Sequence, residues 1–225
     1  AWVRAVRENE YAQVYLNADH TYSFDRVKEA VEAGFDMVIY DNTAASIDEN
    51  IAEAKKCREY LDAYNKENGK DVLLEAELGY IGKSSKVLES LPEGLTETTA
   101  VDAKTFVDAV RPDLLAPAVG NVHGMLKDMP DPNLDEDRVG EIYRAVGIPL
   151  VLHGASGNSA DDIQACIKQG IAVVHVNTEI RVAYKKALEK VAQNKEVAPY
   201  KFMAQVVEDV EKVVEEKLKV FNFLN

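Results

Sequence analysis

Three histidines, His20, His123 and His153, each stand at or near the end of a short apolar run. Taken singly, a histidine at such a place is more often a structural residue than a ligand. Catalytic zinc takes three protein ligands, which need only converge in space, and leaves a fourth position for water or substrate. Together the three imidazoles predict a metal site, with Asp19 beside His20 as a proton-transferring carboxylate.

Two further acids, Asp41 and Glu77, also end apolar runs. Each acid alone is a weak indication, but acids repeated at strand ends suggest one polar rim. Asp19 has an alternative role as the cap of the following helix, although Ser23 is the better capping candidate.

Two segments are of the kind that binds anions. Residues 154–159, Gly-Ala-Ser-Gly-Asn-Ser, follow an apolar run and open a helical pattern, and Asn177 and Thr178 do the same later in the chain. Small residues let backbone N–H groups approach a phosphate, and a helix N-terminus adds a positive field. A tight glycine turn explains the first segment equally well. Lys127 and Arg181 are the cations best placed to help, with a solvated surface role as the alternative for each.

The elements that must position these residues alternate along the chain. Apolar runs predict strands over residues 13–18, 37–40, 72–77, 114–119, 149–153 and 171–176. Amphipathic patterns predict helices over residues 24–33, 47–64, 103–110, 135–146 and 160–169. Strand followed by helix, repeated in this way, indicates an α/β fold with a parallel sheet. In closed barrels of this class the active site lies at the C-terminal ends of the strands, where the three histidines fall.

Two segments stand outside this alternation. Residues 81–100 hold glycines, serines, threonines and three glutamates, and a loop this long is either a functional lid or disordered. Residues 203–221 predict a C-terminal helix with apolar residues at helical spacing, which either packs on the rest of the domain or forms a subunit contact.

Composition limits the class of protein. A chain of 225 residues with 47% apolar content can bury a full core, and its formal charge of −13 argues against a nucleic-acid surface. No apolar run approaches the ~18 residues that span a bilayer, so we expect a cytoplasmic protein without a membrane partner. Cys57 and Cys166 lie in helical patterns outside any CxxC pair and are expected to be reduced, structural thiols.

The chain resembles the class II, zinc-dependent fructose-bisphosphate aldolases and their tagatose-bisphosphate relatives. The resemblance covers most of the chain in order, and the combination of motifs is far more specific than any one of them. The motifs are Asp19-His20, Glu75-Ala76-Glu77-Leu78-Gly79, Gly120-Asn121-Val122-His123-Gly124 with Lys127, Leu152-His153-Gly154-Ala155-Ser156-Gly157, and Val176-Asn177-Thr178 with Arg181.

The resemblance implies a role for each matched residue. His20, His123 and His153 match the ligands of a catalytic Zn2+ ion, and Asp19 matches the acid or base that exchanges a proton with the C4 hydroxyl. Asp41 and Glu77 match acids that can hold a second monovalent or divalent cation. The residues that match substrate- or phosphate-binding groups are Gly124, Lys127, Gly154, Ser156, Asn177, Thr178 and Arg181, the last of which receives the distal phosphate. A loop glutamate moves the carbon-bound proton in the family, and Glu89, Glu93 and Glu97 are the candidates.

Two departures from the family pattern stand out. His175 occupies the place of an asparagine that contacts the enediolate, and it could act in catalysis or serve as a hydrogen-bonded histidine beneath the site. Relatives also place their Asp-His pair much later in the chain. Six strands cannot close an eight-stranded barrel, so we expect a TIM (β/α)8 barrel whose first two strands are absent, in one incomplete domain over residues 1–225.

The sequence therefore favours a metal-dependent aldolase of carbohydrate metabolism that cleaves a ketose 1,6-bisphosphate, fructose or tagatose, to dihydroxyacetone phosphate and glyceraldehyde 3-phosphate. A phosphorylated sugar is the expected substrate, and the resemblance implies a homodimer or homotetramer. One alternative is a non-catalytic, metal-stabilised homologue that acts as a scaffold or binding protein. A metal-dependent hydrolase is a third hypothesis, which explains the phosphate loops poorly.

Overall fold

The computed structural model describes residues 3, 6, 14–84, 86–127, 131–193 and 195–224. Its contacts divide the chain into two compact units. The first unit comprises Ala1–Tyr80, Glu97–Ala118 and Glu141–Leu150, and the second comprises Ile81–Thr96, Val119–Gly140 and Val151–Asn225.

Parallel strands form the centre of the first unit. Strands β1 (Asn17–Thr21), β2 (Met37–Tyr40), β3 (Leu73–Leu78) and β5 (Leu114–Pro117) follow one another in this order. Leu115 of β5 then pairs with Leu150, the first residue of β7 (Leu150–Leu152). β2, β5 and β7 are almost wholly buried, as expected for strands of a parallel sheet that is covered on both faces.

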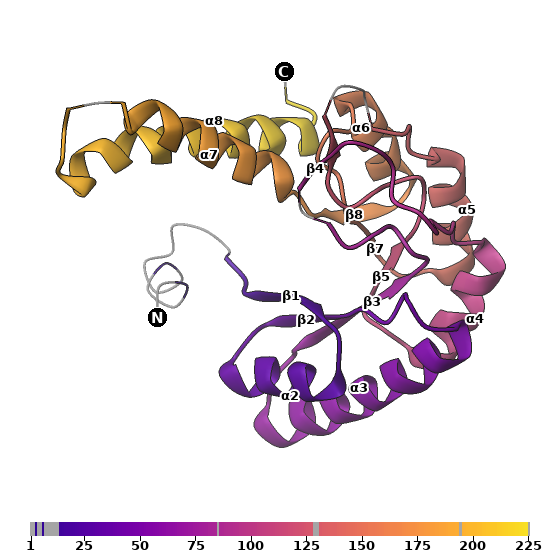
Figure 1. Ribbon diagram of the computed structural model, residues 1–225. Coiled ribbons are helices and arrows are strands. Elements are labelled where there is room, and N and C mark those ends of the chain that lie inside the picture. The colour runs from indigo at the N-terminus through magenta and orange to yellow at the C-terminus, as the bar shows by residue number, and fades with distance from the viewer. Residues whose placement is uncertain are drawn as a thin grey trace. The chain divides into compact units, whose positions relative to one another are not determined.

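Three helices lie along one side of these strands: α2 (Phe24–Ala33), α3 (Ile47–Asn68) and α4 (Ala100–Val110) (Figure 1). Each begins where the sequence supplies an N-cap, because the hydroxyls of Ser23, Ser46 and Thr99 accept from backbone N–H groups in the first turn. The large, fully buried side chains of this unit include Phe106, Ile39, Leu61, Leu74 and Leu115.

The second unit contains most of the predicted irregular segment, residues 81–96, which is partly ordered by strand pairing. β4 (Val87–Leu88) runs parallel to β6 (Met125–Leu126), and the Lys127 N–H donates to the Leu88 carbonyl over 3.0 Å. The same unit holds the remainder of β7, then α6 (Ala160–Gln169) and β8 (Ile171–Val174). α5 (Glu136–Val146) begins in the second unit and ends in the first.

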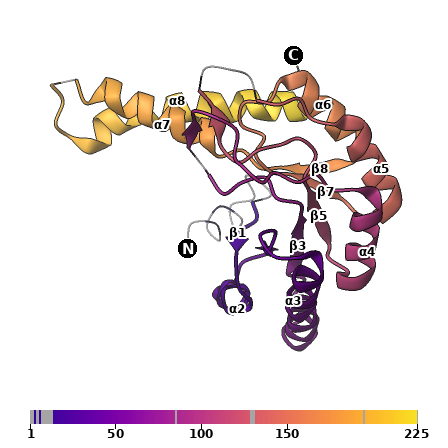
Figure 2. The same ribbon diagram turned by 45° about the vertical axis from the view of Figure 1, so that its right-hand side comes forward.

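Two long helices, α7 (Thr178–Val191) and α8 (Pro199–Phe221), run side by side in the second unit (Figures 1 and 2). Ala187, Val191 and Val206 form the buried contact between them, with Phe202 and Met203 packed beside it. α8 includes the whole range over which the sequence predicts a C-terminal helix.

The predicted α/β class with parallel strands is confirmed, and α2 and α6 have the predicted bounds. The first predicted strand, residues 13–18, was placed too early: Gln13 lies outside the described residues, and β1 begins at Asn17. The Leu16 N–H donates to the Asp36 carboxylate over 2.6 Å. This backbone N–H is therefore bonded to a side chain and not to a neighbouring strand. Both cysteines are buried and free, as predicted.

Among the described residues, no helix is both long enough and apolar enough to cross a membrane.

Candidate active site

His20, the last residue but one of β1, has an unusual backbone conformation. Its φ angle is 52°, in the left-handed region that non-glycine residues rarely adopt, and the pairing of β1 with β2 shifts register between Ala18 and Thr21. Irregular strand ends of this kind re-aim side chains and are concentrated at functional sites. Local geometry therefore singles out the residue that the sequence predicts as a ligand.

The imidazole of His20 is held by two buried acids of the first unit. Its Nδ1 atom lies 3.0 Å from Oε1 of Glu77 and 3.3 Å from Oδ2 of Asp41. Because both neighbours are carboxylates, Nδ1 must carry the proton, and Nε2 is the nitrogen that can bind a metal. Metal-ligating histidines almost always donate their other N–H in this way. Asp19, which is half-exposed, places Oδ1 3.7 Å from Nε2.

The two acids are themselves fixed. The backbone N–H and the hydroxyl of Thr43 donate to Oδ1 of Asp41 over 3.0 and 2.8 Å. Asn50, which is buried, donates from Nδ2 to the backbone carbonyl of Glu77 over 2.9 Å. The pair Asp41 and Glu77 therefore forms a rigid support for His20.

These contacts shift the pKa values of the group in opposite directions. Burial is the largest single influence on His20 and lowers its pKa, but hydrogen bonds to Asp41 and Glu77, with the charges of nearby acids, raise the pKa from 6.5 to about 10. Burial is also the largest influence on Asp41 and raises its pKa, but hydrogen bonds from His20 and Thr43 lower the pKa from 3.8 to about 2. In the absence of metal, His20 is therefore a cation beside Asp41.

One ligand atom from each of His20, Asp41 and Glu77 lies within 4.8 Å of the other two. This spacing suits the second cation that the resemblance implies. Both acids are directed at Nδ1 of His20, which is the arrangement of acids that orient a ligand. The assignment of Asp41 and Glu77 to a second cation stays a prediction.

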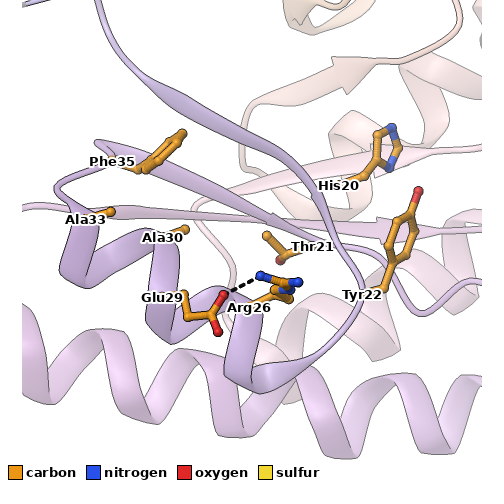
Figure 3. A pocket seen from close by; sticks show the side chains of 8 residues that line it. All are labelled: His20, Thr21, Tyr22, Arg26, Glu29, Ala30, Ala33 and Phe35. Atoms are coloured by element: carbon orange, nitrogen blue, oxygen red, sulfur yellow. Dashed lines mark hydrogen bonds and ion pairs between the residues drawn. The ribbon is translucent and has the colours of Figure 1, made fainter. Parts of the chain in front are cut away.

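A hollow of about 520 Å³ lies beside β1 and α2 in the first unit (Figure 3). The Tyr22 ring stacks on the His20 ring, with centroids 6.0 Å apart, and both rings lie at one end of the hollow. Arg26 and Glu29 form an ion pair of 2.6 Å on its α2 side. The hollow is lined by His20, Thr21, Tyr22, Arg26, Glu29, Ala30, Ala33 and Phe35.

The other histidines lie together in the second unit. The ring of His153, which is buried, stands edge-on to His123 with centroids 5.7 Å apart and stacks on His175 at 4.3 Å. His153 directly follows β7 and His175 directly follows β8, and the His175 N–H donates to the carbonyl of Leu152. His175, which stands in the place of the family asparagine, is thus a direct neighbour of a predicted ligand.

Glycines are required where the predicted anion-binding segments approach other backbone. At Gly154 the φ angle is +60°, and a Cβ atom would lie 2.2 Å from the Val122 carbonyl oxygen. At Gly124 a Cβ atom would lie 2.9 Å from the carbonyl oxygen of Lys86. No side chain fits either position without displacing backbone, so both glycines have a structural reason whether or not an anion binds there.

The two predicted phosphate loops meet in the second unit. Ser156, which is buried, accepts from the Glu179 N–H over 3.3 Å, and the Gly157 N–H donates to Oε1 of Glu179 over 3.0 Å. Thr178 is buried beside this junction. Asn177 is the N-cap residue of α7, but within the described part of the chain its side chain accepts no capping hydrogen bond. The Ser156 hydroxyl thus acts as an acceptor at this junction, whereas the Gly157 N–H acts as a donor.

The sequence did not reveal the partners of these loops. Oε2 of Glu179 lies 2.6 Å from Nζ of Lys217, which reaches it from α8. Asp131, also buried, accepts from the Leu126 N–H, and its pKa is raised by burial and by the charge of Glu179. Nothing in the spacing of Glu179 and Lys217 signals their pairing, because it depends on how two helices pack.

The predicted cations are more exposed. Nζ of Lys127 lies 3.1 Å from Oε1 of Glu89, so one of the three candidate loop glutamates is paired with a predicted phosphate-binding residue. Arg181 lies on the exposed surface of α7. The structure thus groups His20 with Asp19, Asp41 and Glu77 in the first unit, and the other predicted ligands and phosphate groups in the second.

Comparison with known proteins identifies the family. The family model described as "Fructose-bisphosphate aldolase class-II" matches residues 1–225. The chain belongs to the class II fructose-bisphosphate aldolase family. A fructose-bisphosphate aldolase of Staphylococcus aureus (strain Mu50) is 36% identical over 214 residues, which are 94% of this chain and 71% of the relative. A 6-phospho-5-dehydro-2-deoxy-D-gluconate aldolase of Bacillus licheniformis is 35% identical over 210 residues, covering 92% and 68%.

Solved structures agree with this membership. The YdjI aldolase of Escherichia coli K12 has a TM-score of 0.79 and 28% identity, covering 96% of this chain and 72% of that one. A putative fructose-1,6-biphosphate aldolase of Coccidioides immitis has a TM-score of 0.81 and 27% identity, covering 98% and 76%. The relatives of this chain are therefore class II aldolases, which are lyases, and its fold is theirs.

The donor set fits the divalent metal expected for class II aldolases. His20 presents Nε2 while its Nδ1 is held by carboxylates, and His153 is buried beside His123. Imidazole nitrogens oriented in this way are the usual ligands of catalytic zinc.

Proposed function

We propose that this chain catalyses the reversible, metal-dependent aldol cleavage of a ketose 1,6-bisphosphate to dihydroxyacetone phosphate and glyceraldehyde 3-phosphate. The observation that carries the proposal is the orientation of His20, whose Nδ1 faces Glu77 and Asp41 while Asp19 lies beside Nε2. A metal ligand and an acid or base are thereby adjacent on one strand end. Family membership supports the reaction type.

The metal is Zn2+ in this proposal, and its ligands are His20 from the first unit with His123 and His153 from the second. When bound, a divalent metal supplies a Lewis acid that stabilises the negative charge developing on the substrate oxygens. The chain's contribution is to orient the ring of His20 through Asp41 and Glu77 in the first unit, and to hold His123 beside His153 in the second. Metal ligation requires neutral imidazoles, so the second proton leaves His20 when a metal binds.

Asp19 has the proton-transfer role for the C4 hydroxyl. Its carboxylate is half-exposed and lies 3.7 Å from the His20 ring, so it can reach a bound substrate without leaving β1. A glutamate of residues 81–100 moves the proton at the carbon of the dihydroxyacetone-phosphate half, and Glu89, Glu93 and Glu97 remain the candidates. The contact of Glu89 with Lys127 favours an arrangement in which this segment responds to phosphate binding.

Two segments bind the phosphates. The Ser156 hydroxyl and the start of α7 at Thr178 lie at the junction of the two loops, where the donors of a helix N-terminus favour an anion. Gly124, Gly154, Asn177 and Lys127 complete this group, and Arg181 receives the distal phosphate. We also expect one barrel-type domain that assembles as a homodimer or homotetramer and acts in the cytoplasm.

The identity of the ketose is open between fructose and tagatose bisphosphate, and the relatives widen the question because one is named for 6-phospho-5-dehydro-2-deoxy-D-gluconate. All three compounds carry a ketone next to a phosphorylated carbon. Dihydroxyacetone phosphate would be the common product, so the phosphate loops suit each of them. His175, which lies beside the predicted ligand His153, is the residue that we expect to distinguish the substrate preference of this chain from that of its relatives.

The test is a coupled assay for dihydroxyacetone phosphate with each of the three substrates, before and after chelation. We expect cleavage of one bisphosphate that is lost with the metal and restored by Zn2+. Activity that is unaffected by metal removal would contradict the metal-dependent mechanism. Zinc-dependent thermal stabilisation without turnover of any substrate would instead favour the alternative of a non-catalytic, metal-stabilised homologue, for which the unusual His175 is the motivating feature.

A further inference from the structure

One buried amide connects the two predicted metal-ligand segments of the second unit. The Asn121 side chain is 3% exposed and lies two residues before His123. Its Nδ2 donates to the backbone carbonyl of His153 over 2.9 Å, and its Oδ1 accepts from the Val119 N–H over 2.8 Å. One side chain therefore links the segment after β5 to the residue after β7.

The link is rigid because its surroundings allow little movement. Val119 is also held from the other side, since its carbonyl accepts from the Asp135 N–H over 2.9 Å. At Gly120, with φ +94°, a Cβ atom would lie 2.7 Å from the Asn133 carbonyl oxygen. The turn that carries Asn121 is thus enclosed by backbone, and both hydrogen bonds of the amide are buried, where losing one is costly.

A second contact acts in parallel with the amide. Gly154, the residue after His153, lies against the Val122 carbonyl so closely that no Cβ atom fits between them. The contact of Gly154 with Val122 limits how closely the two segments approach. The hydrogen bond from Asn121 to the His153 carbonyl opposes movement of one segment along the other. The rings of His123 and His153, which these two segments carry, have centroids 5.7 Å apart.

We propose that Asn121 is a positioning residue that presets the separation of His123 and His153 and so sets the metal affinity of the site. The inference rests on the proposed function in taking both histidines as ligands. Metal–nitrogen distances tolerate only about 0.2 Å of error, so a ligand pair that must be rearranged on binding loses affinity. Residues that orient ligands typically contribute 10- to 100-fold to metal affinity.

The test compares metal binding by the full chain and its variants, with Co2+ as a spectroscopic probe and Zn2+ in calorimetry. Asn121→Asp retains the acceptor for the Val119 N–H but removes the donor to the His153 carbonyl, and Asn121→Ala removes both. We expect each variant to bind Co2+ about 10- to 100-fold more weakly, with an altered visible spectrum that reports changed ligand geometry.

Asn65→Ala is the matched control. Asn65 makes the same two kinds of bond, because its Oδ1 accepts from the Val72 N–H over 2.9 Å and its Nδ2 donates to the Val72 carbonyl over 3.0 Å. It lies in the first unit at the end of α3, away from any predicted ligand. Its loss should lower thermal stability while leaving Co2+ affinity and spectrum unchanged.

The outcomes separate this inference from the proposed function. If folded Asn121→Asp binds Co2+ with wild-type affinity and spectrum, the positioning role is wrong, whatever the activity. If the wild-type chain binds metal tightly, Asn121→Asp weakens that binding and no ketose bisphosphate is cleaved, the positioning role holds and the proposed function fails. Absence of metal binding by the wild-type chain would overturn both.

Discussion

Oε1 of Glu77 lies 3.0 Å from Nδ1 of His20, and the glutamate side chain is buried. A charged acid in this position stabilises the ring with its proton on Nδ1, which leaves Nε2 as the ligand. The same contact stabilises a second proton on the ring when no metal is bound. Metal and proton therefore compete for Nε2 of His20.

Glu77→Gln tests the orienting role. The variant has nearly the same volume but lacks the negative charge, so we expect Zn2+ affinity to fall about 10- to 100-fold with the fold retained. Calorimetric titration measures this loss. Glu53→Gln is the control, because Glu53 is an exposed partner of Lys56 on α3 and its replacement should change nothing. Unchanged Zn2+ affinity with an altered response to K+ or Na+ would assign Glu77 to a second cation site instead.

The pKa of His20 predicts how the stability of the metal-free protein depends on pH. Its folded pKa of about 10 is above the unfolded value of 6.5, so the contribution is fully present below pH 6.5 and is lost as pH rises through about 10. For Asp41, whose pKa is lowered from 3.8 to about 2, the contribution is present above pH 3.8 and is lost as pH falls through about 2.

Denaturant unfolding in chelator measures this dependence. The difference in unfolding free energy between wild type and His20→Asn should be largest below about pH 6.5 and should shrink as pH rises from there to about 10. A difference that grows with rising pH would show that His20 is not protonated beside Glu77 in the metal-free fold.

Substitutions of His123 and His175 distinguish a predicted metal ligand from a histidine that only lies beside one. His123→Ala should abolish metal-dependent cleavage while leaving the circular dichroism spectrum and unfolding transition largely intact, because one of three ligands is lost. His175→Asn, which supplies the residue that relatives have, should keep metal binding and measurable turnover. Full activity in His123→Ala would refute its assignment as a ligand, and loss of metal from His175→Asn would make His175 a ligand.

The sequence was sufficient for most of the strands and helices and for the placement of several single residues on them. Ser23 starts α2 as the sequence predicts, and His153 follows β7 as the apolar run before it predicts. Such features depend on residues within a few positions of each other, which a sequence shows directly.

Contacts between distant segments could not be predicted. The ion pair of Glu179 with Lys217 depends on how α7 and α8 rotate about their axes, and a lysine on a charged helix gives no signal of a half-buried partner. Asp41 and Glu77 were recognised as acids at strand ends, but their common direction toward His20 follows from strand register and from the irregular end of β1. Asn121 is part of a recognised motif, yet only the structure shows that its amide reaches His153.

The Lys217 contact predicts an effect on substrate binding. Lys217→Met leaves Glu179, which accepts from the Gly157 N–H, without its counterion beside the predicted phosphate loop. We expect KM for the bisphosphate to rise about tenfold, equivalent to about 1.4 kcal/mol, with little change in kcat, and Lys217→Arg to restore it. Lys212→Met is the control, because Lys212 is an exposed residue of the same helix paired with Asp209. Equal KM values in the two methionine variants would show that the ion pair of Lys217 with Glu179 does not influence substrate binding by the loop.

In the proposed mechanism one metal ion, bound by His20, His123 and His153, is required for aldol cleavage. The most direct test of this requirement is a titration of chelated, metal-free protein with Zn2+, in which bound metal and the rate of dihydroxyacetone phosphate formation are measured in the same samples. We predict that activity rises in proportion to bound Zn2+ and reaches its plateau at one ion per chain. Full activity in the metal-free protein would contradict this requirement. So would a rate of dihydroxyacetone phosphate formation that stays constant while Zn2+ binds.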